Sequence, residues 1–199
     1  MPRVVASPVS PSTTTSEGDR PEFDRAANLL GALSLAMTDR MAGVMQGTVA
    51  ASATAAAALS ALGDFLDGAS IDLLSQVLGL TSSGTVRLVD RLSAAGYVRR
   101  APGADARTTS IVLTEAGRRV AADAAAARAD LLADALAGLT ADERSVFEGV
   151  TGRALAAMVR GPGATRWICR LCDTTTCGRA EGKCPVANAS AATDVPRPG

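Results

Sequence analysis

Four cysteines lie close together in the last part of this 199-residue chain, with the spacing Cys-x2-Cys-x4-Cys-x6-Cys. A set of four thiolates suits tetrahedral Zn²⁺ in a closed, structural site. The chain contains no His, and because a reducing cytosol does not maintain structural disulfides, metal binding is favoured over a disulfide framework. Zinc is therefore the predicted cofactor. The predicted ligands are Cys169, Cys172, Cys177 and Cys184.

Two other interpretations of the cysteines stay open. Four Cys ligands also hold iron–sulfur clusters, and Cys184-Pro185 resembles the Cys-Pro pair that ends some ferredoxin runs, although the other spacings differ. The thiols could also be reactive or idle. An iron–sulfur or thiol cluster would make the protein a redox or metal sensor, which is the alternative to a regulator with a metal-stabilised tail.

A second group of candidates is basic. Lys+Arg and Asp+Glu number 20 each, which gives a formal net charge of zero. The charges are unevenly spread, because residues 82–119 hold seven Arg and only three acidic residues. Arg contacts phosphate and guanine through a planar fork, so a local basic face predicts nucleic-acid binding despite the neutral total.

The apolar pattern predicts a helix over residues 82–95 that separates these charges from its packing side. Ser83, Arg87 and Arg91 recur at four-residue steps on the face opposite the apolar stripe. Hydroxyls at a helix start hold phosphates, and Arg reaches base edges in the major groove. The alternative is a solvated face on which Asp90 pairs with Arg87. The apolar stripe consists of Thr85, Leu88, Val89, Leu92 and Ala95.

The elements around this helix predict a mainly α fold with a small β-hairpin. A short helix begins after Ser70 and ends at Gly79, and Thr81 is the N-cap of the helix that follows. Alternating residues predict strands over 97–100 and 109–113, joined by a Pro/Gly loop. This order is typical of a winged helix-turn-helix. Longer helices are expected over 23–47, 52–65, 115–137 and 140–160, the last opened by a capping box from Thr140 to Glu143.

Composition divides the chain into three parts. Residues 1–22 are rich in Pro, Ser and Thr and are expected to form a disordered arm. Residues 23–160 form the folded domain, with its DNA-binding part at about 70–114, and 161–199 form a cysteine-rich tail that is disordered after about 188. No apolar run reaches the roughly 20 residues of a membrane span, and no secretory signal is evident. A cytoplasmic protein without membrane contact is expected.

Several short motifs together resemble the MarR family of bacterial winged helix-turn-helix transcriptional regulators. They are Val-Asp-Arg-Leu at 89–92, Gly-Tyr-Val-Arg-Arg at 96–100, Asp-Ala-Arg at 105–107, and Leu-Thr-Glu-Ala-Gly at 113–117. The long helices on either side also match the family order. The resemblance covers about residues 24–160, and the cysteine tail lies outside it.

The resemblance implies a homodimer that binds double-stranded DNA as a sequence-specific regulator, here expected to be a repressor, and not an enzyme. The helices at about 23–47 and 140–160 would form the dimer, and Arg107 at the wing tip would reach the minor groove with Asp105 bracing it. Relatives commonly bind a small-molecule effector, but the sequence identifies no contact for one. The candidate DNA-contacting residues are Ser82, Ser83, Thr85, Arg87, Arg91, Arg100, Asp105 and Arg107.

Overall fold

The structure is a computed structural model that describes residues 24–48, 52–103, 108–161 and 163–193. It divides into two units within helix α1 (Arg25–Thr48), after Ala36, and each unit is considered by itself. In the first unit the described residues are exposed and, from Arg25 on, helical, and they include Leu29, Leu30, Leu33 and Leu35. The expected arm at 1–22 lies outside the described residues.

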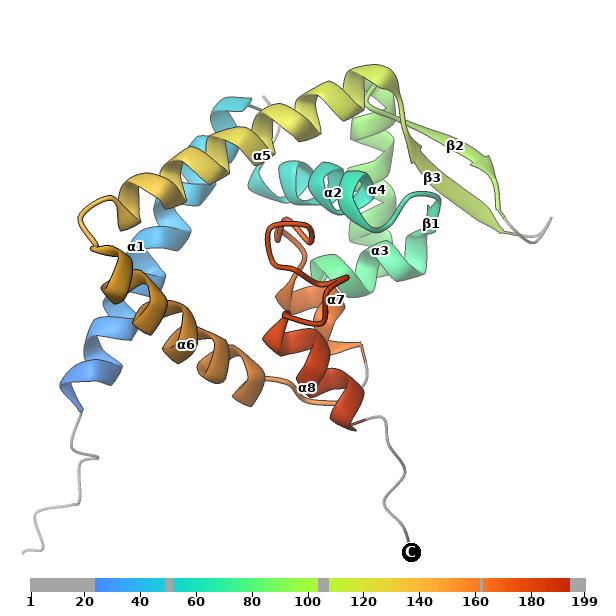
Figure 1. The fold of residues 1–199 in the computed structure, drawn as a ribbon. Coiled ribbons are helices and arrows are strands. Elements are labelled where there is room, and N and C mark those ends of the chain that lie inside the picture. Colours follow the sequence, from blue (N-terminus) through green and yellow to red (C-terminus); the bar gives the residue numbers. More distant parts are fainter. Residues whose placement is uncertain (1–23, 49–51, 104–107, 162, 194–199) are drawn as a thin grey trace, which may run out of the picture. The chain divides into compact units, whose positions relative to one another are not determined.

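The centre of the second unit is built by α2 (Ala53–Asp64), α3 (Ile71–Leu78) and α4 (Ser82–Ala94). Each helix begins at a hydroxyl that accepts a backbone N–H, as Ser70 does from Leu73 at 3.2 Å. Gly79 closes α3 in the left-handed region, at φ 65°, which glycine adopts without strain. These caps confirm the predicted short helix, turn and second helix. Figure 1 shows α3 and α4 as neighbours.

Three short antiparallel strands complete the winged helix-turn-helix: β1 (Ala69–Ser70), β2 (Val98–Pro102) and β3 (Thr109–Leu113). The strand order is β1-β3-β2 (Figure 1). The hairpin was predicted, but β1 was not, because two residues are too short to show an alternating pattern. The core lies between the helices and this sheet and includes Leu59, Leu74, Leu88, Val89 and Ile111.

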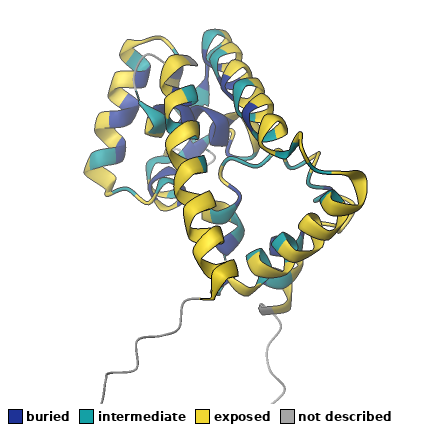
Figure 2. Cartoon of the chain, turned by 90° about the vertical axis from the view of Figure 1, so that its left-hand side faces the viewer, coloured by how far each residue is buried: buried dark blue, intermediate teal, exposed yellow. Residues whose placement is uncertain are grey.

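Two further helices follow, α5 (Glu115–Leu136) and α6 (Ala141–Ala157). The predicted capping box of α6 is confirmed, since the Thr140 backbone N–H donates to Glu143 Oε2 at 2.8 Å and the Glu143 N–H donates to Thr140 Oγ1 at 3.3 Å. The expected burial of α6 is wrong for the single chain, because none of its residues is buried (Figure 2). The residues expected to be buried were Val146, Phe147, Val150, Ala154 and Met158, and Phe147 is 38% exposed.

The cysteine tail is more ordered than predicted. It contains α7 (Ala164–Ile168) and α8 (Pro185–Thr193), so the expectation of disorder after about 188 is wrong up to residue 193, and residues 194–199 lie outside the described residues. The reason is tertiary, because α8 packs against α6 and α7 while α7 packs against α3. None of the helices in the described part of the chain combines the length and apolarity needed to span a bilayer.

Candidate nucleic-acid interface

Helix α4 has one face in the core and one in solvent, as its periodicity predicted. Leu88, Val89 and Leu92 are buried, whereas Ser82, Ser83, Arg87 and Arg91 are exposed. The Thr81 side chain accepts the N–H of Gly84 at 3.1 Å and so begins the helix. The exposed face therefore presents hydroxyls near the helix start and guanidinium groups one and two turns later.

Thr85 is a correction to the candidate set. Its side chain is fully buried, at 0% exposure, and its hydroxyl lies 2.9 Å from Ser75 Oγ and donates to the Thr81 carbonyl at 3.1 Å. A hydroxyl enclosed between α3 and α4 cannot reach a phosphate or a base without unfolding the turn. Thr85 therefore joins the two helices of the helix-turn-helix and does not contact DNA.

Asp90 has a partner on the wing. Arg100 Nη2 on β2 donates to Asp90 Oδ1 at 2.7 Å, whereas the alternative interpretation of a solvated face paired Asp90 with Arg87. The pair ties α4 to the wing, with the two side chains 43% and 55% exposed. Arg100 thus remains solvent-accessible, but its charge is partly neutralised in the free protein.

Val86 is a residue that the sequence analysis overlooked. It is 39% exposed and lies one turn after Ser82 and Ser83 and one turn before Asp90, on the outer face of α4. Exposed methyl groups in this position can contact the C5-methyl of thymine in the major groove. The four-residue periodicity that places Arg87 on the outer face of α4 also places Val86 there, so the signal for Val86 is present in the sequence.

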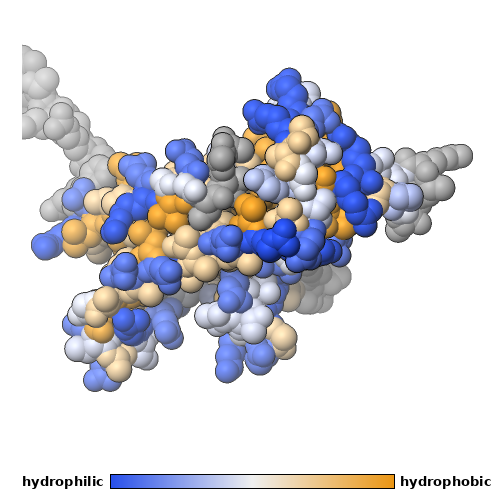
Figure 3. All heavy atoms as spheres, turned by 90° about the horizontal axis from the view of Figure 1, so that it is seen from above, coloured by the Kyte–Doolittle hydropathy of each residue, from blue (hydrophilic) through white to orange (hydrophobic). Residues whose placement is uncertain are grey.

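The wing supplies more exposed positive charge. Arg99 and Arg100 are exposed on β2, and Arg118 and Arg119 are exposed at the start of α5. Figure 3 shows hydrophilic residues gathered at the end of the molecule that carries the wing strands. The predicted minor-groove contact at Arg107 and its brace at Asp105 lie outside the described residues and stay predictions.

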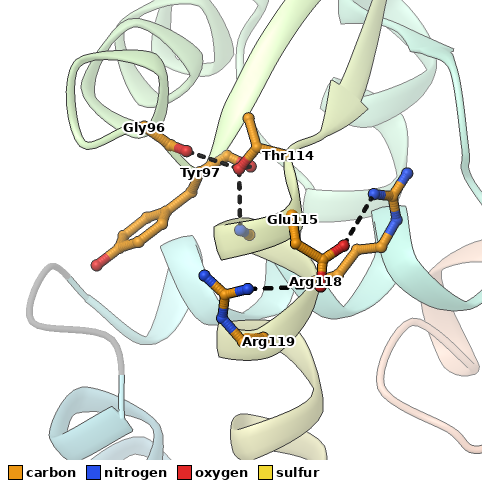
Figure 4. A network of polar contacts seen from close by, with 7 residues as sticks. Gly96, Tyr97, Thr114, Glu115, Arg118 and Arg119 are labelled. Carbon is orange, nitrogen blue, oxygen red and sulfur yellow. Dashed lines mark hydrogen bonds and ion pairs between the residues drawn. The ribbon is translucent and has the colours of Figure 1, made fainter.

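A hydrogen-bond network fixes the junction between wing and α5 (Figure 4). Thr114 Oγ1 donates to the Gly96 carbonyl at 2.6 Å and accepts the Gly117 N–H at 3.0 Å, and its backbone N–H donates to the Tyr97 carbonyl at 3.0 Å. Gly117 packs so closely on Tyr97 that a Cβ would collide with the Tyr97 carbonyl oxygen. The junction therefore holds the end of α4, the first wing strand and α5 in one arrangement.

The cysteines form two neighbouring pairs in the tail. The thiol of Cys169 is hydrogen-bonded to Cys172, and that of Cys177 is hydrogen-bonded to Cys184. Electrostatic interactions join Cys169 to Cys184 and Cys172 to Cys177, so the two pairs face each other. The four cysteines are not joined by disulfides. In the part of the chain that the structure describes, no three Cys, Asp or Glu side chains already form a metal-binding group.

Cys169, Cys172 and Cys177 lie in different environments, and the pKa values of their thiols therefore differ. The hydrogen bond from Cys169 lowers the pKa of Cys172 to about 6, against the effect of burial, while Arg128 and Arg179 lower it further. The same hydrogen bond raises the pKa of Cys169. Burial, and then the bond to Cys184, raise the pKa of Cys177 to about 11. Cys172 is thus the most acidic of Cys169, Cys172 and Cys177.

A surface cavity of about 410 Å³ lies where the tail meets α2 and α5. Its lining includes Ser60, Asp64, Arg128, Leu171 and Asp173. Burial, and then the charge of Asp173, raise the pKa of Asp64, and Arg128 opposes the rise. The buried Nε atom of Arg128 has no hydrogen-bond partner in the structure. An acidic side chain of α2 and a basic side chain of α5 therefore meet an acidic side chain of the tail here.

Comparisons with known proteins agree with this geometry. The sequence model of the MarR family matches residues 52–108. MepR, a transcription regulator of the Staphylococcus aureus multidrug efflux pump MepA, is 16% identical with a TM-score of 0.59, over 69% of this chain and 100% of that one. A MarR family protein from Bacillus stearothermophilus is 25% identical with a TM-score of 0.60, over 68% and 94%.

Wild-type MarR from E. coli, in its apo form, is 23% identical with a TM-score of 0.53, over 63% of this chain and 96% of that one. Comparison with curated protein sequences gives no match. The family match falls on the helix-turn-helix and most of the wing, and the solved structures share the fold beyond it. The resemblance inferred from the motifs is thereby confirmed: residues 52–108 match the MarR family of transcriptional regulators, and the chain shares the winged helix-turn-helix fold of solved structures of that family.

Proposed function

We propose that the protein is a sequence-specific DNA-binding transcriptional repressor that acts as a homodimer. Members of the MarR family are transcriptional regulators, not enzymes. The observation that carries the proposal is the division of α4, whose inner stripe is buried in the core while Ser82, Ser83, Arg87 and Arg91 stand in solvent. A helix held on one side and polar on the other is what entry into the major groove requires.

The chemistry of the exposed face assigns a role to each part. Ser82 and Ser83, with the N–H groups at the start of α4, suit phosphate oxygens. Arg87 and Arg91 suit the O6 and N7 acceptors of guanine or the backbone, and Val86 suits a thymine methyl group. The positive charge on β2 adds a contribution that does not depend on sequence and that salt screens.

Two exposed apolar surfaces support the homodimer. In the first unit Leu30 and Leu33 are exposed one turn apart on α1, and in the second unit Val146, Phe147 and Val150 are exposed on α6. Adjacent exposed apolar side chains of this size are unusual unless a partner covers them. A second copy of the chain is the partner we propose, because two-fold symmetry would present two α4 helices to half-sites roughly 34–36 Å apart.

The test of DNA binding is recovery of bound fragments from the genome of the source organism, followed by titration of the purified protein on the enriched sequence. We expect one enriched motif with two-fold symmetry, and higher transcription from the adjacent promoter when the gene is deleted. Uniform, weak binding to all fragments would contradict sequence-specific recognition. Lower transcription on deletion would contradict the repressor role while leaving DNA binding intact.

The dimer is tested by sedimentation equilibrium of the full chain and of Phe147→Asp. We expect a dimer for the wild type and a shift toward monomer for the variant, because an aspartate on an apolar interface would be buried without a partner. Ala122→Asp, at an exposed position near the start of α5, is the control for the added charge. A wild-type monomer at micromolar concentration with DNA present would contradict the proposal. A small-molecule effector and a cytoplasmic location stay predictions.

A further inference from the structure

The cysteine tail is the one chemically distinctive region that DNA binding leaves unexplained. We propose that Cys169, Cys172, Cys177 and Cys184 bind one Zn²⁺ per chain. Binding of this ion stabilises the tail in its folded form, packed on the winged helix-turn-helix, here called the DNA-reading domain. No part of the resemblance covers this segment. The placement of the sulfurs, the charges around them and the contacts of the folded tail support this site.

Backbone turns bring the sulfurs together. The Cys172 N–H donates to the Cys169 carbonyl at 2.9 Å, which folds the Cys-x2-Cys segment into a tight turn directly after α7. The loop before Cys177 is closed by Asp173, whose Oδ1 accepts the Thr175 N–H at 2.8 Å and whose carbonyl accepts the Cys177 N–H at 3.1 Å. A short Cys-x2-Cys turn is a common source of two ligands in tetrahedral zinc sites.

The second half of the site is shaped by glycines and by α8. Gly178 and Gly182 have φ values of 63° and 70°, and the Lys183 N–H donates to the Gly178 carbonyl at 2.9 Å. These turns return the chain so that Cys184 faces the earlier cysteines. The Ala187 N–H on α8 donates to Cys184 Sγ at 3.5 Å, which is the kind of backbone donation that stabilises a metal-bound thiolate.

The charges around the sulfurs fit a thiolate-rich ion. Arg179 interacts with Cys169, Cys172 and Cys177, and Arg128 on α5 interacts with Cys172. Zn²⁺ held by four thiolates carries a net charge of about −2. Two nearby guanidinium groups would offset that charge. On binding, one Zn²⁺ replaces the thiol protons, which are released to solvent. The two sulfur pairs then close around the ion.

The tail has little else to hold it together. Its own apolar cluster is small, with Val159, Ala164 and Val186 packed beside the buried sulfurs of Cys169 and Cys184. Fixing some two dozen residues opposes folding through conformational entropy. Structural zinc supplies free energy of folding to short segments of this type. An ion at the centre of the four cysteines would supply the folding free energy that the few large apolar side chains of this cluster do not.

The folded tail touches elements that position α4, the recognition helix of the proposed DNA contact. Leu171 packs on the core of the winged domain, and α7 packs on α3, which joins α4 through the buried Thr85 (Figure 1). Asp173 interacts electrostatically with Asp64 on α2 and with Arg128 on α5. Loss of the ion would therefore release contacts on three helices of the DNA-reading domain.

Metal content is measured first, on full-length protein purified without oxygen and without chelator. We expect about one zinc per chain, lost in Cys172→Ser and in Cys177→Ser, whose less buried side chains make misfolding a smaller risk. Ala180→Ser, at an exposed position of the same loop, is the matched control and should keep its zinc. Added Co²⁺ should give the thiolate charge-transfer absorption of a tetrahedral site. Iron with sulfide, two disulfides, or no metal would each overturn the proposal.

Hydrogen exchange with and without a chelator tests the folding role. We expect faster exchange over residues 164–187 after zinc removal, while the amides of α4 and α5 stay protected. Unchanged exchange in the tail would overturn that role. Affinity for the enriched DNA should fall several-fold in the metal-free protein, and an unchanged affinity would overturn docking onto the reading domain. This last measurement alone rests on the proposed function, so a protein that holds zinc but selects no DNA would refute the function and leave the metal site standing.

Discussion

Asp90 on the recognition helix accepts a hydrogen bond from Arg100 on the first wing strand, with 2.7 Å between Oδ1 and Nη2. The pair places a negative charge on the face that we assign to DNA and partly neutralises a positive one. It also links α4 to the wing, so the two parts that would enter neighbouring grooves are in direct contact. Removing the carboxylate therefore changes DNA binding more than it changes stability.

For Asp90→Asn we expect tighter binding to all DNA, because repulsion of phosphates is removed and Arg100 becomes available to them. The stability loss should be only about 0–1 kcal/mol, as both partners are exposed. Fluorescence anisotropy at several salt concentrations measures the first effect and thermal unfolding the second. Asp134→Asn, at an exposed position on α5, controls for the change in net charge. Weaker binding by Asp90→Asn would show that the pair positions the wing.

Arg87 and Arg91 can be separated into base and phosphate contacts. If either reaches a base edge, its substitution by Ala should cost about 1–3 kcal/mol on the enriched site and relax selectivity at one position. A phosphate contact should instead weaken all sequences alike and lower the salt slope by about one. Val86→Ala should lose selectivity at a thymine without changing the salt slope. Unchanged affinity for all three variants would remove α4 from the interface.

Thr85→Val tests the reassignment of a buried hydroxyl. The variant keeps the shape of the side chain but loses the contacts with Ser75 and the Thr81 carbonyl. We expect the free energy of unfolding to fall by about 1 kcal/mol, and DNA affinity per folded molecule to stay unchanged. Chemical denaturation and anisotropy below the unfolding transition give the two values. A stable variant with weak DNA binding would restore Thr85 to the contact set.

Gly117→Ala tests the close approach between α5 and the wing. The added methyl group would collide with the Tyr97 carbonyl, so either α5 or the strand must shift, and we expect a loss of about 1–3 kcal/mol. Gly63→Ala is the matched control, because its Cβ would lie at ordinary contact distance, 3.6 Å from Leu113 Cδ1. Higher helix propensity should make that control neutral or stabilising. Equal unfolding temperatures for the two variants would contradict the packing argument.

Glu143→Gln tests the capping box of α6 through pH. Hydrogen bonds from Thr140 hold the pKa of the Glu143 carboxyl below its usual value. A lowered pKa means that the carboxylate stabilises the helix above the unfolded pKa of about 4.3, and that this contribution disappears as pH falls through the folded value. The variant should unfold at a lower temperature than wild type near neutral pH and at the same temperature in acid. Glu148→Gln, at an exposed position of the same helix outside the capping box, is the control for the loss of one carboxylate.

Local interactions explain which elements the sequence could predict. Ser70, Thr81, Thr114 and Thr140 each cap a helix through a bond to an N–H three residues later, and Gly79 ends a helix through its own backbone freedom. Such contacts are contained within one turn of chain and appear in the order of residues. The winged helix-turn-helix, its recognition helix and the exposed Ser83, Arg87 and Arg91 were predictable for that reason.

Choices between partners far apart in sequence were not predictable. Periodicity placed Thr85 in the apolar stripe although its hydroxyl made it a candidate DNA contact, and the packing of α3 on α4 decided that this hydroxyl is enclosed beside Ser75. Asp90 had an arginine available on its own helix, and the position of β2 decided that it bonds Arg100 instead. A charged or polar side chain can satisfy several partners equally well, so the tertiary arrangement selects one.

The tail shows the same division. The sequence by itself determined that four thiols lie within one short segment, and the prediction of zinc rests on that spacing. Tertiary structure decided that Cys169 pairs with Cys172 and Cys177 with Cys184, and that α7 and α8 pack on α3 and α6. Short helices with few large apolar residues are not stable alone, so their existence depends on surfaces that only the folded chain provides.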